Sequence, residues 1–423
     1  AGGKGARPVP TARPWRLWWS RSWLLSLGTV LGIAAVVSPF RLVRACGDAG
    51  SYLDLGARIA EGSLRIADVP EKRGAAFPAL EAVGFVSGDA VAVGLLPALG
   101  VAGLMSMYAI VCAHGHRRGS DAEPDADVRR AALVASALVL TNSQFLVHIV
   151  LIGPHLATAF WLLLLAAVAA DSSRVSGARR SLVVFSLATA LAAGRPEGAI
   201  LVALVMAPAL VSASGDLWIR SHDLRWAGLA VVLWQVPHRS DGFEVLPSAE
   251  GVMIIALGGL LLLLSAPSML RRIGRLPIVG LGLAGAWLAL AGAFALDSGL
   301  VTRSLVATAA NVALDVGGWG VSLLLLTVIG LATRAVVGER FPLRSGLLLG
   351  TFLPVHLVIV FLTGSAYRIG QSDSFNRMLF HSVPLLVVAT AVGILRGETA
   401  SNGDGALRTD GAEGNKGVGM GDA

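Results

Sequence analysis

The chain has 423 residues, of which 55% are hydrophobic and only 14% are charged, and its mean hydropathy is +0.71. Soluble proteins carry about 25% charged residues, so this chain has too little polar surface for water and is expected to be a polytopic membrane protein in a lipid bilayer. The formal net charge of +7 does not indicate a nucleic-acid partner, because no basic run is interleaved with aromatic residues.

Both ends of the chain differ in composition from its middle. Residues 1–22 are rich in Gly, Pro and Arg and end in a tryptophan cluster, which is typical of a disordered cytoplasmic arm with interfacial aromatics. The first apolar run, 23–40, has no small-residue cleavage site behind it, so we interpret it as a retained helix. Residues 396–423 lack an apolar period, and a disordered cytoplasmic tail is expected there.

Between these tails, over residues 23–395, the sequence predicts an all-α bundle of about twelve apolar segments, judged against the ~20 residues that a crossing helix needs. They are 23–40, 90–113, 131–147, 153–170, 181–194, 198–213, 226–237, 251–268, 277–296, 317–333, 345–363 and 378–395. Two of them, 181–194 and 226–237, are too short to cross alone at 1.5 Å per residue. These two are tilted or broken, or the count is one or two too high.

The distribution of Lys and Arg predicts that both termini lie inside. When the N-terminus is placed inside and the segments alternate, the inside stretches carry most of the basic residues. The first outer loop, 41–89, is basic as well, but long loops are less bound by this rule. This loop also carries many outward-facing polar residues, which indicates more than a connector.

Within this loop, the stretch "SYLDLGARIAEG" predicts a short amphipathic helix. Apolar residues recur at helical spacing from Tyr52, while Asp54 and Arg58 lie on the opposite face. Ser51 has the chemistry of an N-cap, and Gly62 that of a helix stop. A helix of about three turns would lie flat on the outer leaflet, and the following stretch "AAFPALEAVGFVSG" is expected to lie on the membrane too.

Asp48 precedes this helix and follows the first apolar run, at a junction that faces the outer compartment. A carboxylate there is partly removed from water and can act as a general base. An ordinary loop or capping aspartate explains the same residue. The local sequence leaves both interpretations open.

Three stretches together resemble the GT-C superfamily of membrane glycosyltransferases, such as the dolichyl-phosphate-mannose-protein mannosyltransferases. The first is the loop aspartate with its tyrosine-containing helix and the "FPAL" segment, 77–80. The second is "AAGRPEGAILV", 192–202, and the third is "DSFNRMLFHSVPLL", 373–386. The resemblance implies a membrane helix bundle with surface helices in its first outer loop.

The resemblance also implies a reaction and a set of residues. Asp48 would be the general base that deprotonates an acceptor hydroxyl, and the sugar would leave a polyprenyl-phosphate donor with inversion. Arg377, Arg195 and Arg368 would bind the donor phosphate, because the planar guanidinium can bind two of its oxygens. The acceptor class stays open among lipid, glycan and protein.

Four further residues are assigned to the donor and acceptor groove: Tyr52, Glu197, Asn376 and His381. Each has a structural alternative. Glu197 pairs equally well with Arg195 at a tight turn whose Pro196 begins a helix. The polar residues before the last helix equally form an interfacial belt.

No metal site is assigned. His148 and His155 flank a Gly-Pro turn without a nearby carboxylate, and Cys46 and Cys112 have neither metal nor disulfide spacing. Many GT-C proteins carry Asp-Glu or Asp-x-Asp in the first loop, whereas Asp48 is followed here by Ala and Gly. The resemblance therefore assigns no certain cofactor and leaves a divalent cation open.

Two other functions compete with the transferase. A secondary transporter or lipid flippase would show an internal repeat and charges at mid-membrane, and neither is evident in the sequence. A GT-C-like scaffold without activity would also fit a loop with a single acid. The Ala-, Gly-, Arg- and Val-rich composition is typical of a high-GC bacterium, which predicts the bacterial cytoplasmic membrane and an extracytoplasmic active site.

Overall fold

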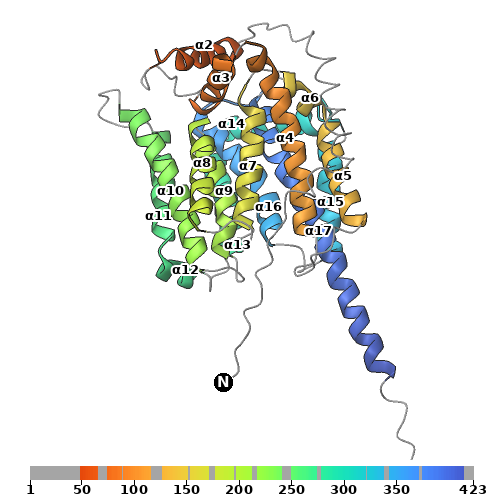
Figure 1. Ribbon diagram of the computed structural model, residues 1–423. Coiled ribbons are helices and arrows are strands. Elements are labelled where there is room, and N and C mark those ends of the chain that lie inside the picture. The colour runs from red at the N-terminus through yellow and green to blue at the C-terminus, as the bar shows by residue number, and fades with distance from the viewer. Residues whose placement is uncertain are drawn as a thin grey trace, which may run out of the picture.

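The computed structural model describes residues 48–64, 74–87, 89–115, 126–150, 153–170, 177–194, 197–211, 217–240, 249–273, 278–320, 322–337, 343–370 and 374–413. All regular elements in these ranges are α-helices (Figure 1). The expected all-α class is therefore confirmed. The predicted arm 1–22 and the first apolar segment, 23–40, lie outside the described residues.

The helices follow one another along the chain with short connections. They are α2 (Asp48–Ala60), α3 (Ala76–Ser87), α4 (Asp89–Gly115), α5 (Ala126–Leu140), α6 (Ser143–Val150), α7 (His155–Ala170), α8 (Gly177–Gly194), α9 (Gly198–Val211), α10 (Leu217–Ser240), α11 (Ala249–Leu264), α12 (Pro267–Ile273), α13 (Ile278–Leu296), α14 (Ser298–Ala313), α15 (Ser322–Val337), α16 (Leu343–Thr363) and α17 (Ser374–Glu413). Figure 1 shows α2 and α3 across one end of an upright bundle.

Several expected segments coincide with helices, and two prove longer than expected. The segments 181–194 and 226–237 are the apolar parts of α8 and α10, which begin earlier, at Gly177 and Leu217. The added turns carry arginines, which are good helix formers but are excluded by an apolar window. The short length of these two apolar segments therefore does not require a break in either helix.

Two helix breaks were not expected from the sequence. The segment 131–147 is divided into α5 and α6, which meet at 70°, and Asn142 caps α6 by accepting a hydrogen bond from the Gln144 amide at 2.9 Å. Residues between the expected segments 277–296 and 317–333 form α14 instead of a loop. Asp297 caps this helix by accepting a hydrogen bond from the Leu300 amide, and α14 turns by 120° from α13.

The expected number of membrane segments is not confirmed. Among the described residues, one helical stretch, Ser374–Leu395, is long and apolar enough to cross a membrane by itself. The bent pairs α5–α6 and α13–α14 raise this number to three if each pair counts as one span. The capped bends shorten the continuous apolar stretches that the sequence presents as single segments.

Helix α17 lies at the centre of the bundle. It contacts α4, α5, α6, α7, α15 and α16, and 78% of its most apolar part lies buried inside the protein. Beyond Leu395 the helical backbone continues to Glu413, into the region for which a disordered tail is expected. This extension contains no proline, the residue that most effectively ends a helix.

Helices α2 and α3 form a layer over the bundle, the α2–α3 layer. The predicted amphipathic helix is present, but it starts at Asp48, so the expected N-cap at Ser51 is wrong and Ser51 lies inside the first turns. Gly62 ends the helix as expected: its φ is +69°, and the Ser63 amide donates to the Arg58 carbonyl at 2.9 Å.

One main-chain joint connects this layer to the bundle. The Ala75 amide donates to the Ala193 carbonyl, near the C-terminal end of α8, at 2.8 Å. Gly74 precedes it with a φ of +64°, and a Cβ at this position would lie 2.3 Å from the Ala193 oxygen. Only glycine fits here, because both the backbone conformation and the space exclude a side chain.

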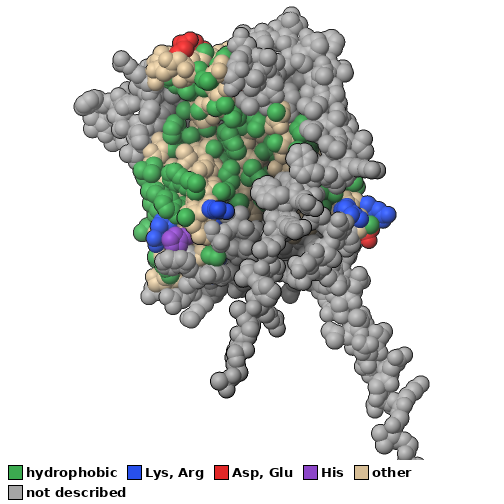
Figure 2. Space-filling view, in the orientation of Figure 1, with side chains coloured by type: hydrophobic (Ala, Val, Ile, Leu, Met, Phe, Trp, Pro, Cys, Tyr) green, Lys and Arg blue, Asp and Glu red, His purple; other side chains and the backbone are tan. Residues whose placement is uncertain are grey.

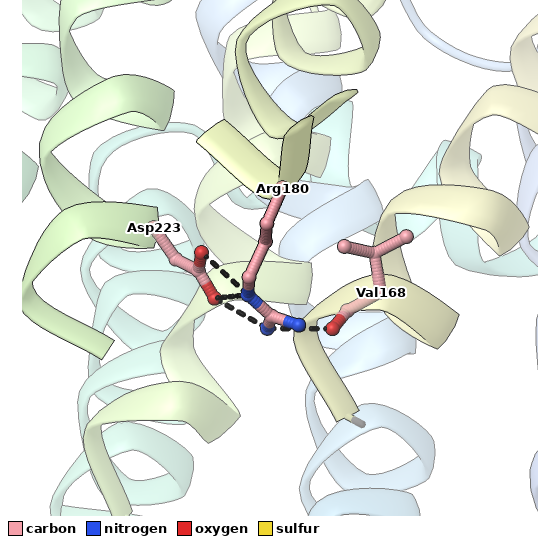
Figure 3. Close-up of polar contacts among 3 residues, drawn as sticks. All are labelled: Val168, Arg180 and Asp223. Atoms are coloured by element: carbon pink, nitrogen blue, oxygen red, sulfur yellow. Dashed lines mark hydrogen bonds and ion pairs between the residues drawn. The ribbon is translucent and has the colours of Figure 1, made fainter. Parts of the chain in front are cut away.

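At the far end of α8, a buried ion pair connects three helices (Figure 3). The Arg180 guanidinium donates to the Asp223 carboxylate of α10 at 2.6–3.1 Å and to the Val168 carbonyl of α7 at 2.7 Å. The exposed fractions of the two charged side chains are 4% and 2%. Removing one charge would leave the other buried without its partner.

We expect Asp223→Ala to lower the free energy of unfolding by about 3–5 kcal/mol, because it leaves a buried guanidinium uncompensated. Thermal unfolding of the purified protein in detergent measures the change. Arg130→Ala is the matched control, because it breaks an ion pair with Asp127 whose side chains are 77% and 78% exposed. Equal changes of the unfolding temperature in the two variants would contradict the expectation that the Arg180–Asp223 pair is buried.

The joint yields a second expectation. Gly74→Ala should destabilise the protein more than Gly62→Ala, although both positions have positive φ. A left-handed alanine costs roughly 1–2 kcal/mol at either site, but a Cβ at Gly62 meets nothing within 4 Å. Thermal unfolding and trypsin cleavage after Arg58 measure the effect, and similar behaviour of the two variants would argue against the joint.

Candidate functional site

The three stretches that resemble GT-C proteins come together around the first turns of α7. The joint already described connects the start of α3 to the end of α8. A Cβ at Gly194 would lie 3.9 Å from Thr158 Oγ1 and 3.7 Å from the Trp161 ring, so the end of α8 lies against α7. The "FPAL" segment and the "AAGRPEG" step are therefore neighbours in space, although more than a hundred residues separate them in the sequence.

The third stretch reaches α7 through a pair of histidines. His155 Nδ1 at the start of α7 lies 2.9 Å from His381 Nε2 of α17. The two rings are stacked, with centroids 5.1 Å apart and an interplanar angle of 18°. Both side chains are buried, with exposed fractions of 3% and 0%. One ring must donate and the other accept in this bond. At least one of the two imidazoles is therefore neutral.

A third histidine and an arginine complete the group. The His148 ring of α6 lies 5.1 Å from the His155 ring and 4.7 Å from the Phe380 ring, centroid to centroid. Arg377, one turn before His381 on α17, is close enough for its charge to act on His148. We call His148, His155, Arg377 and His381 the histidine–arginine cluster.

Beside this cluster, buried polar atoms lack hydrogen-bond partners among the described residues. They include Nε2 of His148 and Oγ1 of Thr158, whose side chains are each 2% exposed. Buried polar groups are nearly always paired, so such atoms need an explanation such as a bound molecule. The position is therefore a candidate site for a polar ligand.

The three histidines do not form a metal centre. No group of His, Cys, Asp or Glu in the described ranges is arranged to hold a metal ion. His155 Nδ1 and His381 Nε2 are bonded to each other at 2.9 Å, whereas ligation requires several nitrogens to point at one position.

Buried amides hold the neighbouring loops in place. Asn376 is fully buried: its Oδ1 accepts from Trp319 Nε1 at 2.8 Å, and its Nδ2 donates to the Gly370 carbonyl at 2.8 Å. Asn311 Nδ2 donates to the Arg368 carbonyl at 2.9 Å, and the Gly370 amide donates to Asn311 Oδ1 at 2.8 Å. Both amides are thus occupied by the protein itself.

The structure places the site residues predicted from the sequence at several different positions. Arg377 and His381 lie together in the cluster, and the half-buried Glu197 lies three residues beyond the end of α8. Tyr52 is 3% exposed and packs edge-on against Phe77, with ring centroids 5.5 Å apart, inside the α2–α3 layer.

The remaining predicted residues lie away from the cluster or outside the description. Arg368 is exposed on the loop that follows α16, and Asn376 is engaged as described above. Asp48 is the first residue of α2, and its side chain is outside the described atoms. Arg195 lies outside the described residues.

Several residues of this region are not evident as site residues from the sequence. Glu81 of α3 is 1% exposed and packs beside Gly56 of α2. A single acid inside the apolar stretch "AAFPALEAVGFVSG" was the available signal, since isolated charges in such stretches are costly. Thr158 and Gln144 gave no signal, because a threonine or glutamine in an apolar run has many ordinary roles.

Comparisons with known protein families and with curated proteins give no match. Among solved structures, the apo form of the Archaeoglobus fulgidus oligosaccharyltransferase has a similar fold, with a TM-score of 0.52 and 15% sequence identity. The match covers 97% of this chain and 54% of that one, so this chain spans about half the length of the archaeal protein. The chain therefore shares its fold with an oligosaccharyltransferase, as the GT-C resemblance implied, and among the described residues its stretch Ser374–Leu395 is long and apolar enough to cross a membrane.

Proposed function

We propose that this protein is an integral-membrane glycosyltransferase that transfers a sugar from a polyprenyl-phosphate donor to an acceptor hydroxyl. The observation that carries the proposal is the meeting of the three GT-C-like stretches at the start of α7. The fold shared with an oligosaccharyltransferase supports it, and so do the unpaired buried polar atoms at the same position. A bundle of apolar helices alone would support a transporter equally well.

In the proposed reaction, Asp48 removes the proton from the acceptor hydroxyl. The oxygen attacks the anomeric carbon, and a carbon–oxygen bond forms as the bond from that carbon to the donor phosphate breaks. The polyprenyl phosphate leaves from the opposite face, so the configuration inverts. Asp48 begins α2, and the layer that carries this helix is joined to α8 beside α7.

The leaving phosphate needs positive charge in a site shielded from water. Arg377 is half-buried next to three buried histidines, and charge acts more strongly there than in water. Arg195 directly follows α8, whose last residues contact α7 and the Ala75 amide. We assign Arg377 as the main phosphate ligand, with Arg195 and the exposed Arg368 as further candidates.

The other groove residues have supporting roles in this proposal. The His155–His381 pair fixes the orientation of α17 relative to α7, and Glu197 lies two residues after Arg195 in the same step. Tyr52 acts through packing, because its ring is buried against Phe77. Asn376 holds the adjoining loop through Trp319 and Gly370.

We further propose that the α2–α3 layer faces the extracytoplasmic side of a bacterial cytoplasmic membrane. The support is the charge distribution, which assigns the basic connections to the inside. The α2–α3 layer is joined to the last residues of α8, and the first residues of α8, which include Arg179 and Arg180, lie at the other end of that helix (Figure 1). These two arginines belong to a stretch that the charge distribution assigns to the inner side.

We expect Asp48→Asn to reduce sugar transfer by about 10²–10⁴-fold, the usual contribution of a general base. The assay uses membranes with radiolabelled polyprenyl-phosphate sugars, at matched protein levels and with and without a chelator. Asp54→Asn is the matched control, because this residue lies on the same helix and is exposed. Equal transfer by all three proteins would remove Asp48 from the chemistry. Absence of transfer by the wild type with every donor would favour a transporter or a scaffold.

Arg377→Gln should lower kcat by roughly 10²–10³-fold, as expected when one ligand of developing charge is removed. Arg303→Gln is the control, since Arg303 is exposed on α14 and donates to the Gly299 carbonyl of its own helix. Separate measurement of kcat and KM for the lipid donor distinguishes a loss of charge stabilisation from weaker binding alone. An unchanged kcat would reject the assignment of Arg377 to the leaving phosphate.

A further inference from the structure

A cleft lies at the other end of α8, far from the candidate site. It has a volume of about 500 Å³ and opens between the first halves of α8 and α10. Helix α8 has 18 residues, so at 1.5 Å per residue its start lies about 27 Å from the joint with the α2–α3 layer. The two positions are thus separated by nearly the hydrocarbon thickness of a bilayer.

Both walls of the cleft follow helical periodicity. Residues 178, 181, 182 and 185 line it from α8, together with Gly177 and Arg180, and 219, 222, 223 and 226 line it from α10. Apart from Gly177 and Arg180, the lining residues form two sets of four. Each set has the spacing i, i+3, i+4, i+7, so each is one face of its helix. Phe185 and Trp226 meet edge-on across the cleft, with ring centroids 5.7 Å apart. Leu182 is 65% exposed, so an apolar side chain stands at the surface of the cleft.

Exposed arginines stand beside the lining residues of the cleft. Among the lining residues Asp223 is the only acid, and its charge is matched by Arg180 (Figure 3). Arg179 precedes Leu182 by three residues, and Arg225 follows His222 by three, so each neighbours a lining residue on its helix. Both arginines are exposed. Among the described residues, the charge left over near the cleft is therefore positive.

The surface around these helices also combines an apolar part with a basic part. Figure 2 shows a hydrophobic area over the left and central part of the visible face, with basic and His side chains at its lower edge. Such a border of basic residues below apolar surface is the pattern that meets a phospholipid: acyl chains against the apolar part and the phosphate against the cations.

We propose that this cleft binds one anionic phospholipid. An acyl chain lies along Leu182, Phe185 and Trp226, and the headgroup phosphate contacts Arg179 and Arg225, with Ser181 and His222 as hydrogen-bond partners. A free anion would use the arginines but not the apolar walls. The lipid is distinct from the sugar donor, whose phosphate we place at the opposite end of α8, and its binding does not depend on the proposed transferase activity.

Native mass spectrometry of the delipidated full-length protein tests the proposal with two probes, phosphatidylglycerol and zwitterionic phosphatidylcholine. The wild type should prefer phosphatidylglycerol, and the preference should weaken as salt is raised. The double variant Arg179→Gln/Arg225→Gln should bind phosphatidylglycerol roughly 30-fold more weakly, the loss expected for two arginines near an anionic surface. Arg130→Gln/Arg303→Gln removes the same charge from exposed positions on other helices and should bind as the wild type does.

Leu182→Gln tests the apolar half separately. Because its side chain is largely exposed, the change should leave the fold intact while weakening the binding of both lipids. Equal binding of the two lipids by the wild type would overturn the proposal, and so would equal losses in the two double variants. Neither result would bear on sugar transfer, because the assay measures lipid binding alone.

Discussion

The geometry of the candidate site depends on how the backbone is satisfied where helices break inside an apolar bundle. Unpaired amide and carbonyl groups are costly away from water, and this chain supplies buried side-chain amides at its breaks. Asn142 caps α6 and also donates to Ser322 Oγ at 2.6 Å. Gln144 donates to the Gly317 carbonyl, while Asn376 binds Trp319 and Gly370.

These amides fix the two helices that carry most of the histidine–arginine cluster. His148 lies one turn after Gln144 on α6, and Arg377 directly follows Asn376 on α17. Residues that hold the backbone and residues of the candidate site are therefore close neighbours in the same short stretches of sequence. Positioning from rigid helix ends suits a site in which charges must be held in place. Of the polar residues at the start of the last helix, Asn376 therefore has a structural role and the adjacent Arg377 a proposed functional one.

Local features of the fold could be predicted from the sequence, whereas contacts between distant elements could not. The helix stop at Gly62 follows from the residue itself, because glycine tolerates positive φ. The break at Asn142 has a local signal that an apolar window ignores, since one asparagine hardly changes a hydropathy average. The same limit hid α14, whose cap at Asp297 resembles an ordinary loop aspartate.

The candidate site shows the same division. The three GT-C-like stretches were recognised separately, but their meeting at α7 depends on main-chain and ring contacts that no spacing encodes. The His155–His381 contact joins residues 226 positions apart in sequence. Amphipathic periodicity shows that Tyr52 lies on the apolar face of its helix, but it does not show which residue this face contacts. That residue is Phe77, in the next helix of the same layer.

The joint between the α2–α3 layer and the bundle has a consequence for how such proteins can diversify. Its hydrogen bond runs from one backbone to another, from Ala75 to Ala193, and its only strict side-chain requirement is the absence of one at Gly74. The surface that the layer presents can thus change its sequence while its attachment persists. A protein built this way can acquire a new recognition surface without rebuilding the helices beneath it.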